Sequence, residues 1–167
     1  MKKLYLAFTL LLLFTQAQAQ YQVGIGAYLN TTSGFSSPNF PESELSSYDL
    51  SFKFVFDDYS CYDVIFGWKT EDYFHFTIMQ EVHRQLFYPV DIYVGLGVHL
   101  GAWNDKHFRR LDMAIPENKM FGGLSGSIGL QFTMMPIAIS VGWRPVLDIV
   151  GGDRFDFVKQ LGVRYCF

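Results

Sequence analysis

Hydrophobic and polar residues alternate along most of this chain. The pattern is clearest in residues 90–101, where every second position from Ile92 to Leu100 is aliphatic. The positions between them hold only tyrosine, glycine and histidine. A period of two places the two kinds of side chain on opposite faces of a β-strand, and a helix does not produce it. The chain is therefore expected to fold mainly as strands.

The same alternation predicts eight strands. Each is about as long as a tilted strand needs to be to cross a membrane. We place them at residues 21–30, 48–56, 61–69, 73–84, 90–101, 120–134, 137–144 and 160–167. The predicted fold class is all-β, an eight-stranded antiparallel up-and-down transmembrane β-barrel, formed by one domain spanning residues 20–167.

The connections differ in length in a regular way. Those after the second, fourth and sixth strands are short, whereas 31–47, 104–119 and 148–155 form long loops after the first, fifth and seventh. Only the connection around Glu71, after the third strand, is short where a long one is expected. Short periplasmic turns and longer extracellular loops are typical of outer-membrane barrels. This pattern predicts that both termini are periplasmic.

The polar face predicts a filled interior. An eight-stranded barrel is just wide enough for its inner side chains to fill it, and nearly all strand glycines fall on the polar face. Charges of both signs fall there too, so they can pair across the interior and leave no open pore. They are Asp49, Lys53, Asp63, Lys69, Glu81, Asp91, Arg144 and Arg164. A soluble lipocalin-like barrel would instead turn its apolar face inward.

Aromatic residues gather near both predicted ends of the strands, as in the two interfacial girdles of a membrane barrel. The outer group is Tyr48, Trp68, Phe74 and Trp143, and the inner group is Phe56, Tyr62, Phe87, Tyr88, Tyr165 and Phe167.

The first 19 residues have the three regions of a secretory signal peptide. Lys2 and Lys3 precede an apolar run from Leu4 to Phe14, and the segment ends at Ala19. Cleavage there would move the formal net charge from −3 to −5, which excludes a typical nucleic-acid binder. Half of the residues are hydrophobic, yet the rest of the chain holds no stretch long enough for a membrane helix. Export without membrane helices favours a barrel.

The C-terminal strand carries a resemblance to a known family. Gln160, Gly162, Tyr165 and Phe167 occupy every place of a polar-x-Gly-x-x-aromatic-x-aromatic pattern. This segment resembles the assembly signal of bacterial outer-membrane β-barrels, and the whole pattern is similar to OmpA/OmpX-like barrels. The resemblance implies that the barrel-assembly machinery is a partner. Residues 142–145 and 151–153 also resemble small outer-membrane proteins of the Bacteroidota, which implies no particular activity.

The sequence contains four histidines, which are candidates for a catalytic or a metal-binding role. A barrel that hydrolyses or transfers lipid A acyl chains needs an acid/base histidine or a nucleophilic hydroxyl open to the lipid. His75 and Thr77 are the weak candidates, with Ser125 and Ser127 on another strand. The sequence lacks the His-x-Ser-Asn signature of lipid A deacylases. An enzyme of this kind and a narrow channel are the alternatives to a barrel without catalytic activity.

His83, Glu81 and Asp91 are expected near one another at the inner end of the barrel. Hydrogen-bonded interior histidines are the favoured interpretation, so we predict no metal and no cofactor. Cys61 and Cys166 are expected as two interior thiols rather than a disulfide, because their strands are separated around the barrel.

The densest basic cluster outside the signal segment contains Lys106, Arg109 and Arg110. On the outer face it would meet lipopolysaccharide phosphates through bidentate arginine contacts. A solvated loop, partly balanced by Asp105 and Asp112, is the alternative. The sequence as a whole predicts a monomeric outer-membrane barrel with a structural or surface-interaction role.

Overall fold

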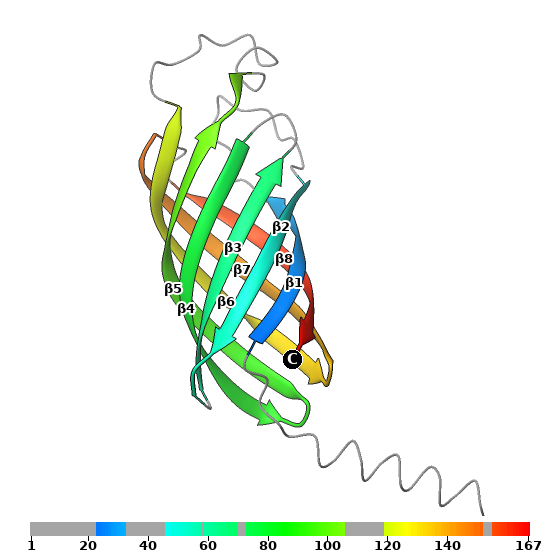
Figure 1. Ribbon diagram of the computed structural model, residues 1–167. Helices are drawn as coiled ribbons and strands as arrows, with labels where there is room; N and C mark the ends of the chain where they lie inside the picture. Colours follow the sequence, from blue (N-terminus) through cyan, green and yellow to red (C-terminus); the bar gives the residue numbers. More distant parts are fainter. Residues whose placement is uncertain (1–22, 33–45, 58, 70–72, 106–118, 152–154) are drawn as a thin grey trace, which may run out of the picture.

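The chain forms a closed barrel of eight antiparallel strands that follow one another in sequence order (Figure 1). The computed structural model describes residues 23–32, 46–57, 59–69, 73–105, 119–151 and 155–167. The last strand pairs with the first and closes the sheet. The strands are β1 Val23–Thr32, β2 Ser46–Val55, β3 Ser60–Lys69, β4 Tyr73–Phe87, β5 Val90–Trp103, β6 Met120–Met134, β7 Ile137–Val150 and β8 Asp156–Cys166. The predicted fold class is confirmed.

The strand bounds differ from prediction mainly at the ends. The sixth strand is as predicted, but β7 continues six residues past Arg144, and β8 starts four residues before Gln160. The loop predicted at 148–155 is correspondingly shorter, because Asp148 to Val150 belong to β7. Leu86 and Phe87, expected in a connection, extend β4. These segments pair with neighbouring strands, with register shifts at Leu86 and Ile149, and their own side-chain pattern gave no sign of the pairing.

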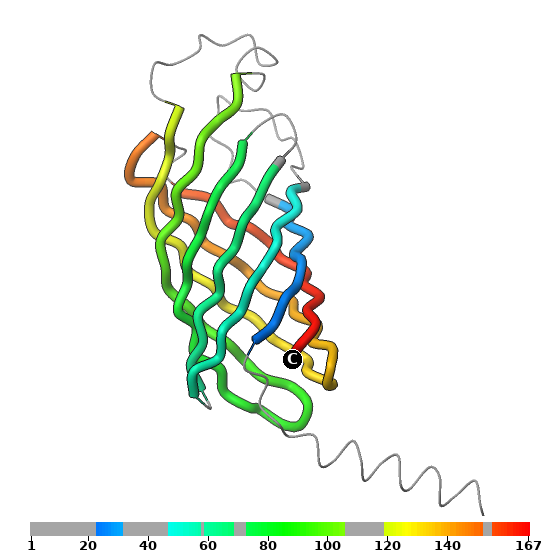
Figure 2. Tube along the Cα trace, viewed as in Figure 1, coloured from blue at the N-terminus to red at the C-terminus, as the bar shows by residue number. Residues whose placement is uncertain are grey.

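The register fixes the tilt of the strands. Leu130 of β6 is linked through Val141, Leu161, Leu29, Tyr48, Trp68, Phe74 and Ala102 back to β6 at Met120. One circuit of the barrel therefore ends ten residues away on the same strand. A stagger of this kind requires strongly tilted strands, typically about 35–45° in barrels of this class. The tilt is visible along the tube in Figure 2.

Side chains alternate between the two sides of the wall as predicted. In β4, Phe74, Ile78 and Val82 are exposed, whereas His75, Thr77 and Glu81 are buried. The interior, hereafter the lumen, is mostly polar, with a small apolar cluster of Tyr28, Ile65 and Met79. The lipocalin-like alternative is therefore wrong, because the apolar face of the sheet points outward.

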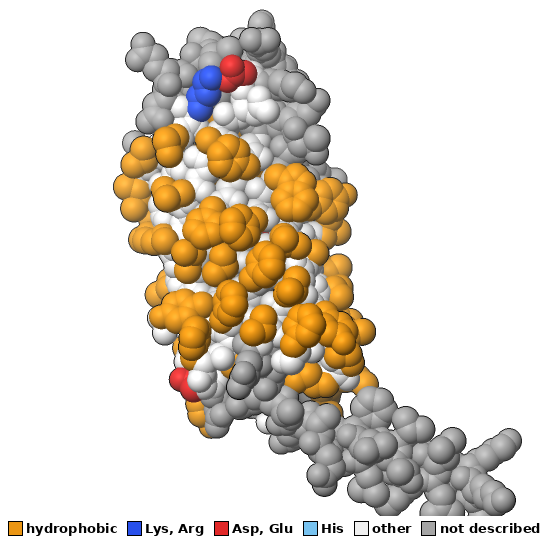
Figure 3. Space-filling model, in the orientation of Figure 1, with side chains coloured by type: hydrophobic (Ala, Val, Ile, Leu, Met, Phe, Trp, Pro, Cys, Tyr) orange, Lys and Arg blue, Asp and Glu red, His pale blue; other side chains and the backbone are white. Residues whose placement is uncertain are grey.

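The outer wall is covered by large hydrophobic side chains. Figure 3 shows them over the whole middle of the visible face, with charged side chains only near its two ends. Leu96, Val98 and Leu100 of β5 are each more than half exposed. All ten residues of the two predicted aromatic groups are exposed as well. Among the described residues, no helix is long and apolar enough to cross a membrane.

Short turns join the strands at the end where the C-terminus lies (Figure 1). After β2, Asp57 accepts hydrogen bonds from the Ser60 hydroxyl and from the amides of Tyr59 and Ser60. These bonds, the hydroxyl's first, hold the pKa of Asp57 below its ordinary value. Tyr88-Pro89 and Met135-Pro136 form the other two turns. The predicted signal peptide and most of the long loops lie outside the described residues.

Candidate functional site

Among the described residues, three lysine or arginine side chains in the lumen form ion pairs with carboxylates on strands that are not their neighbours in the sheet. Lys53 Nζ lies 2.6 Å from Glu81 Oε2. Arg144 Nη2 lies 3.0 Å from Asp49 Oδ2, and Arg164 Nη2 lies 3.1 Å from Asp63 Oδ2. All six side chains are almost fully buried. The prediction that interior charges of opposite sign pair across the lumen is confirmed for these six residues.

Arg164 is the centre of the first of four clusters of polar side chains in the described part of the lumen. Its Nη2 also donates to the Tyr28 and Ser51 hydroxyls, at 2.7 and 2.9 Å, and its Nη1 donates to Gln131 Oε1. Tyr28 and Ser51 in turn donate to the two oxygens of Asp63. The buried carboxylate therefore accepts from an arginine and two hydroxyls, as a buried charge requires.

The second cluster joins Arg144 to His75. Besides its pair with Asp49, Arg144 Nη2 contacts His75 Nε2 at 3.4 Å. His75 Nε2 lies 3.5 Å from Asp49 Oδ2. Gly67 leaves the space for this contact, because an added Cβ there would overlap His75 and Asp49 Oδ1. His75 is thus held inside the lumen by a carboxylate and a guanidinium.

The third cluster combines a serine, a histidine and an aspartate. Ser125 Oγ lies 2.9 Å from His99 Nδ1, and Asp148 Oδ1 lies 2.6 Å from His99 Nε2. A catalytic triad links the same three residue types, but there the serine bonds to Nε2 and the aspartate to Nδ1, so the histidine ring is reversed here. Only 2% of Ser125 and 4% of His99 is exposed, and Phe121 packs against the histidine. The cluster is therefore a buried hydrogen-bonded network whose serine and histidine are almost fully enclosed.

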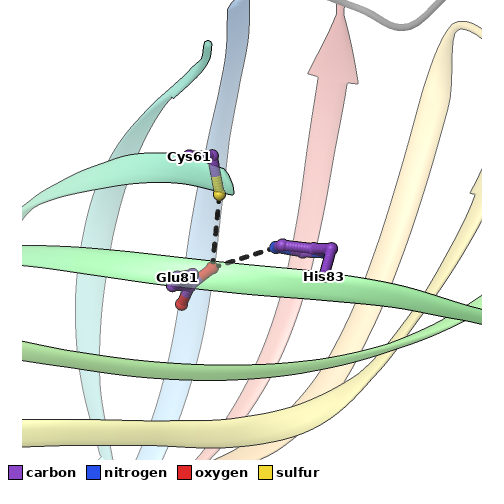
Figure 4. A group of neighbouring side chains, drawn as sticks. All are labelled: Cys61, Glu81 and His83. Carbon is purple, nitrogen blue, oxygen red and sulfur yellow. Dashed lines mark hydrogen bonds and ion pairs between the residues drawn. The ribbon is translucent and has the colours of Figure 1, made fainter. Parts of the chain in front are cut away.

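The fourth cluster lies toward the short-turn end and contains Cys61, Glu81 and His83 (Figure 4). Cys61 projects from β3, and the other two project from β4. Cys61 Sγ lies 3.9 Å and His83 Nε2 lies 3.3 Å from the same oxygen, Glu81 Oε2. Lys53 Nζ approaches both Glu81 Oε2 and His83 Nε2, the latter at 3.2 Å. Ser127 donates to the other oxygen, Glu81 Oε1.

The structure places the weak catalytic candidates in the lumen. Both His75 and Thr77 are buried there, so neither has the lipid-facing position that acyl transfer from membrane lipids would require. Ser125, expected as a partner for His75, bonds to His99 instead.

Two further expectations about the inner residues are resolved. His83 and Glu81 are in contact as predicted, but Asp91 pairs in register with Gln85 and Gln131 and does not join them. Cys61 takes the third place in that cluster. Cys61 and Cys166 are both free and buried, as expected.

The remaining predicted site residues are the basic cluster and the terminal-strand pattern. Lys106, Arg109 and Arg110 lie outside the described residues. Of the terminal-strand pattern, Gln160 and Gly162 face the lumen, whereas Tyr165 and Phe167 are exposed on the outer wall.

Sequence reasoning missed the Ser125–His99–Asp148 and Cys61–Glu81–His83 clusters for the same reason. All members except Asp148, which was predicted in a loop, were placed on the inner face of their strands from the sequence alone. Which inner residues meet depends on the stagger between strands and, for Asp148, on β7 extending beyond Arg144. No local pattern carries that information.

Comparison with known proteins agrees with the architecture. The chain matches no family model and no curated protein sequence. It is similar in structure to a de novo designed transmembrane β-barrel, with a TM-score of 0.58, 12% identity, and coverage of 90% of this chain and 98% of that chain. It is also similar to Ail, the attachment invasion locus protein of Yersinia pestis, with a TM-score of 0.56 and 14% identity over 87% of this chain and 96% of that chain. Neisserial surface protein A gives a TM-score of 0.55 and 16% identity over the same shares. The chain therefore has the fold of small outer-membrane β-barrels.

Proposed function

We propose that this protein is a monomeric, integral outer-membrane β-barrel with a filled lumen and a structural or surface-interaction role. The observation that carries the proposal is the inversion of the usual arrangement of a soluble protein. Its large hydrophobic side chains are on the outside, and its charged side chains are paired on the inside. Such an exterior is stable only against lipid or detergent.

The filled lumen supports a structural role over transport. Lys53, Asp49 and Asp63, together with their partners, join strands that are not neighbours in the sheet. Separating any pair would leave a buried charge without compensation, which is costly. We therefore expect no steady conductance.

The sequence supports the direction of insertion. The N-terminal segment would direct export, and the terminal strand would engage the barrel-assembly machinery through Gln160, Gly162, Tyr165 and Phe167. With the short turns on the periplasmic side, both termini are periplasmic. The long connections then face the cell exterior.

The surface role that we propose involves lipopolysaccharide. Lys106, Arg109 and Arg110 stand in the connection between β5 and β6, and their charges suit phosphate groups. A structure of Ail was determined in complex with the heparin analogue sucrose octasulfate. That barrel, of similar fold, accepts a polyanion, which supports testing anionic ligands with this chain.

The membrane proposal is tested by heat-modifiable gel migration of membrane-extracted protein. Unboiled samples in mild detergent should migrate apart from boiled ones, because a closed barrel resists unfolding by detergent. Recovery in the soluble periplasmic fraction without such a shift would refute the proposal. In planar bilayers, the refolded protein should give no steady current, and regular conductance steps would refute the filled lumen.

The surface proposal is tested with Lys106→Gln, Arg109→Gln and Arg110→Gln combined. Binding of the refolded protein to lipopolysaccharide-containing vesicles should weaken and lose salt dependence. Arg84→Gln, an exposed arginine near the opposite end, is the control. Equal binding by the unmodified protein, the triple variant and Arg84→Gln would contradict the role assigned to this segment.

A further inference from the structure

We propose that Cys61, Glu81 and His83 form a binding site for a divalent cation of borderline softness such as Zn²⁺. Thiolate, imidazole and carboxylate are the three ligand types that proteins use for zinc. The three side chains come from two adjacent strands whose register is fixed by the β3–β4 ladder. The site is therefore held by the barrel wall itself.

The distances between the ligand atoms suit tetrahedral coordination. With ordinary zinc–ligand bond lengths, neighbouring nitrogen and oxygen ligands lie about 3.4 Å apart, and sulfur and oxygen lie about 3.6 Å apart. The observed separations are 3.3 Å for His83 Nε2 to Glu81 Oε2 and 3.9 Å for Cys61 Sγ to the same oxygen. All three atoms lie within 4.8 Å of one another. Small side-chain movements would therefore complete the ligand set.

A positive charge already lies beside two of the three ligands. Lys53 Nζ lies 2.6 Å from Glu81 Oε2 and 3.2 Å from His83 Nε2. With the His83 proton on Nδ1, the Nε2 lone pair accepts from the Lys53 ammonium, which can only donate. That lone pair is the one a metal would use. Lys53 thus acts as a resident cation with which zinc competes.

The exchange balances in charge. Before binding, the Lys53 ammonium offsets the Glu81 carboxylate, while the Cys61 thiol and the imidazole are neutral. Zinc binding releases the thiol proton and one ammonium proton to solvent and adds two positive charges. The four side chains with the metal are again neutral together, so a buried cluster can accept the ion without an uncompensated charge.

His83 is the most accessible of the three ligands, because Cys61 and Glu81 are only 2% and 1% exposed. The His83 side chain is 16% exposed, and its backbone amide bonds to the Tyr59 carbonyl in the turn after β2. Its ring stacks on Tyr93 at 5.4 Å, which orients the imidazole. A hydrated ion can therefore reach the histidine first and the buried thiol afterwards.

The test is isothermal titration of Zn²⁺ into the full mature chain, refolded in detergent without a histidine tag. We expect one ion per chain. Cys61→Ser should weaken binding by at least about ten-fold, the range in which loss of a group at a metal site usually acts. Cys166→Ser is the matched control, because it removes the other buried thiol and should leave the affinity unchanged. Cd²⁺ should give a thiolate charge-transfer band with the control but not with Cys61→Ser.

Lys53→Met provides an independent test, because it removes the competing cation and leaves Glu81 without compensation. Zinc should then bind more tightly and raise the unfolding temperature more than in the unmodified chain. If this variant does not fold, judged by its gel migration, the two cysteine variants still decide. The proposal is overturned if the unmodified chain binds no stoichiometric zinc or if Cys61→Ser binds as well as Cys166→Ser.

Discussion

At the scale of single residues, the lumen is organised around buried arginines. Arg164 of β8 contacts Tyr28 of β1, Ser51 of β2, Asp63 of β3 and Gln131 of β6. One side chain thus links five strands. Its charge is offset by the Asp63 carboxylate, so the pair joins β8 to β3 across the lumen.

Arg164→Met should lower the free energy of unfolding by about 3–5 kcal/mol, because Asp63 is left buried without its partner. Urea unfolding of the refolded protein measures the change. Lys159→Met, which removes an exposed cation from the same strand, should not destabilise the barrel. A loss below about 1 kcal/mol for Arg164→Met would show that the pair behaves like a solvated one.

Gly67→Ala should destabilise the protein by about 1–3 kcal/mol, the usual cost of overpacking. The new methyl group would displace His75 from Asp49. Gly126→Ala is the control, because its Cβ would meet only the Pro145 ring, at 3.1 Å, among nearby side chains. Urea unfolding compares the two variants, and equal stability would contradict the close approach at Gly67.

At the scale of elements, the β6–β7 ladder is interrupted. Its register omits Gly126 and Ser127 on one strand and Pro145 and Arg144 on the other, but it is unchanged on both sides of the gap. The amide of Thr133 bonds to the carbonyl of Pro89, directly before β5, so odd-numbered residues of β6 face β5 and even-numbered ones direct their backbone groups toward β7. Gly126 therefore faces Pro145, which has no N–H to donate to its carbonyl.

Pro145→Val should restore that hydrogen bond and stabilise the barrel by about 0.5–1.5 kcal/mol. Hydrogen exchange at the new amide of residue 145 reports whether the hydrogen bond forms, and urea unfolding measures the change in the free energy of unfolding. A rapidly exchanging amide would show that the strands are held apart at this point by something other than the missing donor.

At the scale of the whole molecule, the apolar exterior defines the part of the barrel that would meet lipid. Val98 lies between Ile78 and Leu124 in the register, and all three are exposed. Ile149 lies near the end of β7, away from the middle of the wall.

Val98→Arg should destabilise the barrel in lipid vesicles by about 2–4 kcal/mol, whereas Ile149→Arg should cost about 0–1 kcal/mol. The difference arises because the cost of a charge depends on its depth in the bilayer. Reversible urea unfolding in vesicles compares them. Equal effects would contradict the membrane position that we propose.

Much of the fold was predictable from the sequence. Alternation such as that from Ile92 to Leu100 determined the strands, their number and the face that each residue occupies. It did so because a strand's side chains alternate by geometry, whatever the strand pairs with. The same alternation identified Asp49, Glu81, Arg144 and the other charged residues of the polar face as interior charges. The OmpA/OmpX-like and Bacteroidota resemblances stay predictions.

Only the tertiary structure decided which interior residues meet. A stagger of ten residues per circuit brings Asp63 to Arg164 and Asp49 to Arg144, and the pairing of β7 beyond Pro145 brings Asp148 to His99. The same register brought Cys61 rather than Asp91 to Glu81 and His83. The alternation along a strand fixes the side of the wall on which a residue lies. Which residues touch depends also on how high along the barrel each one lies and on which strands stand beside it. Those are properties of the closed sheet as a whole, set by how all eight strands pair.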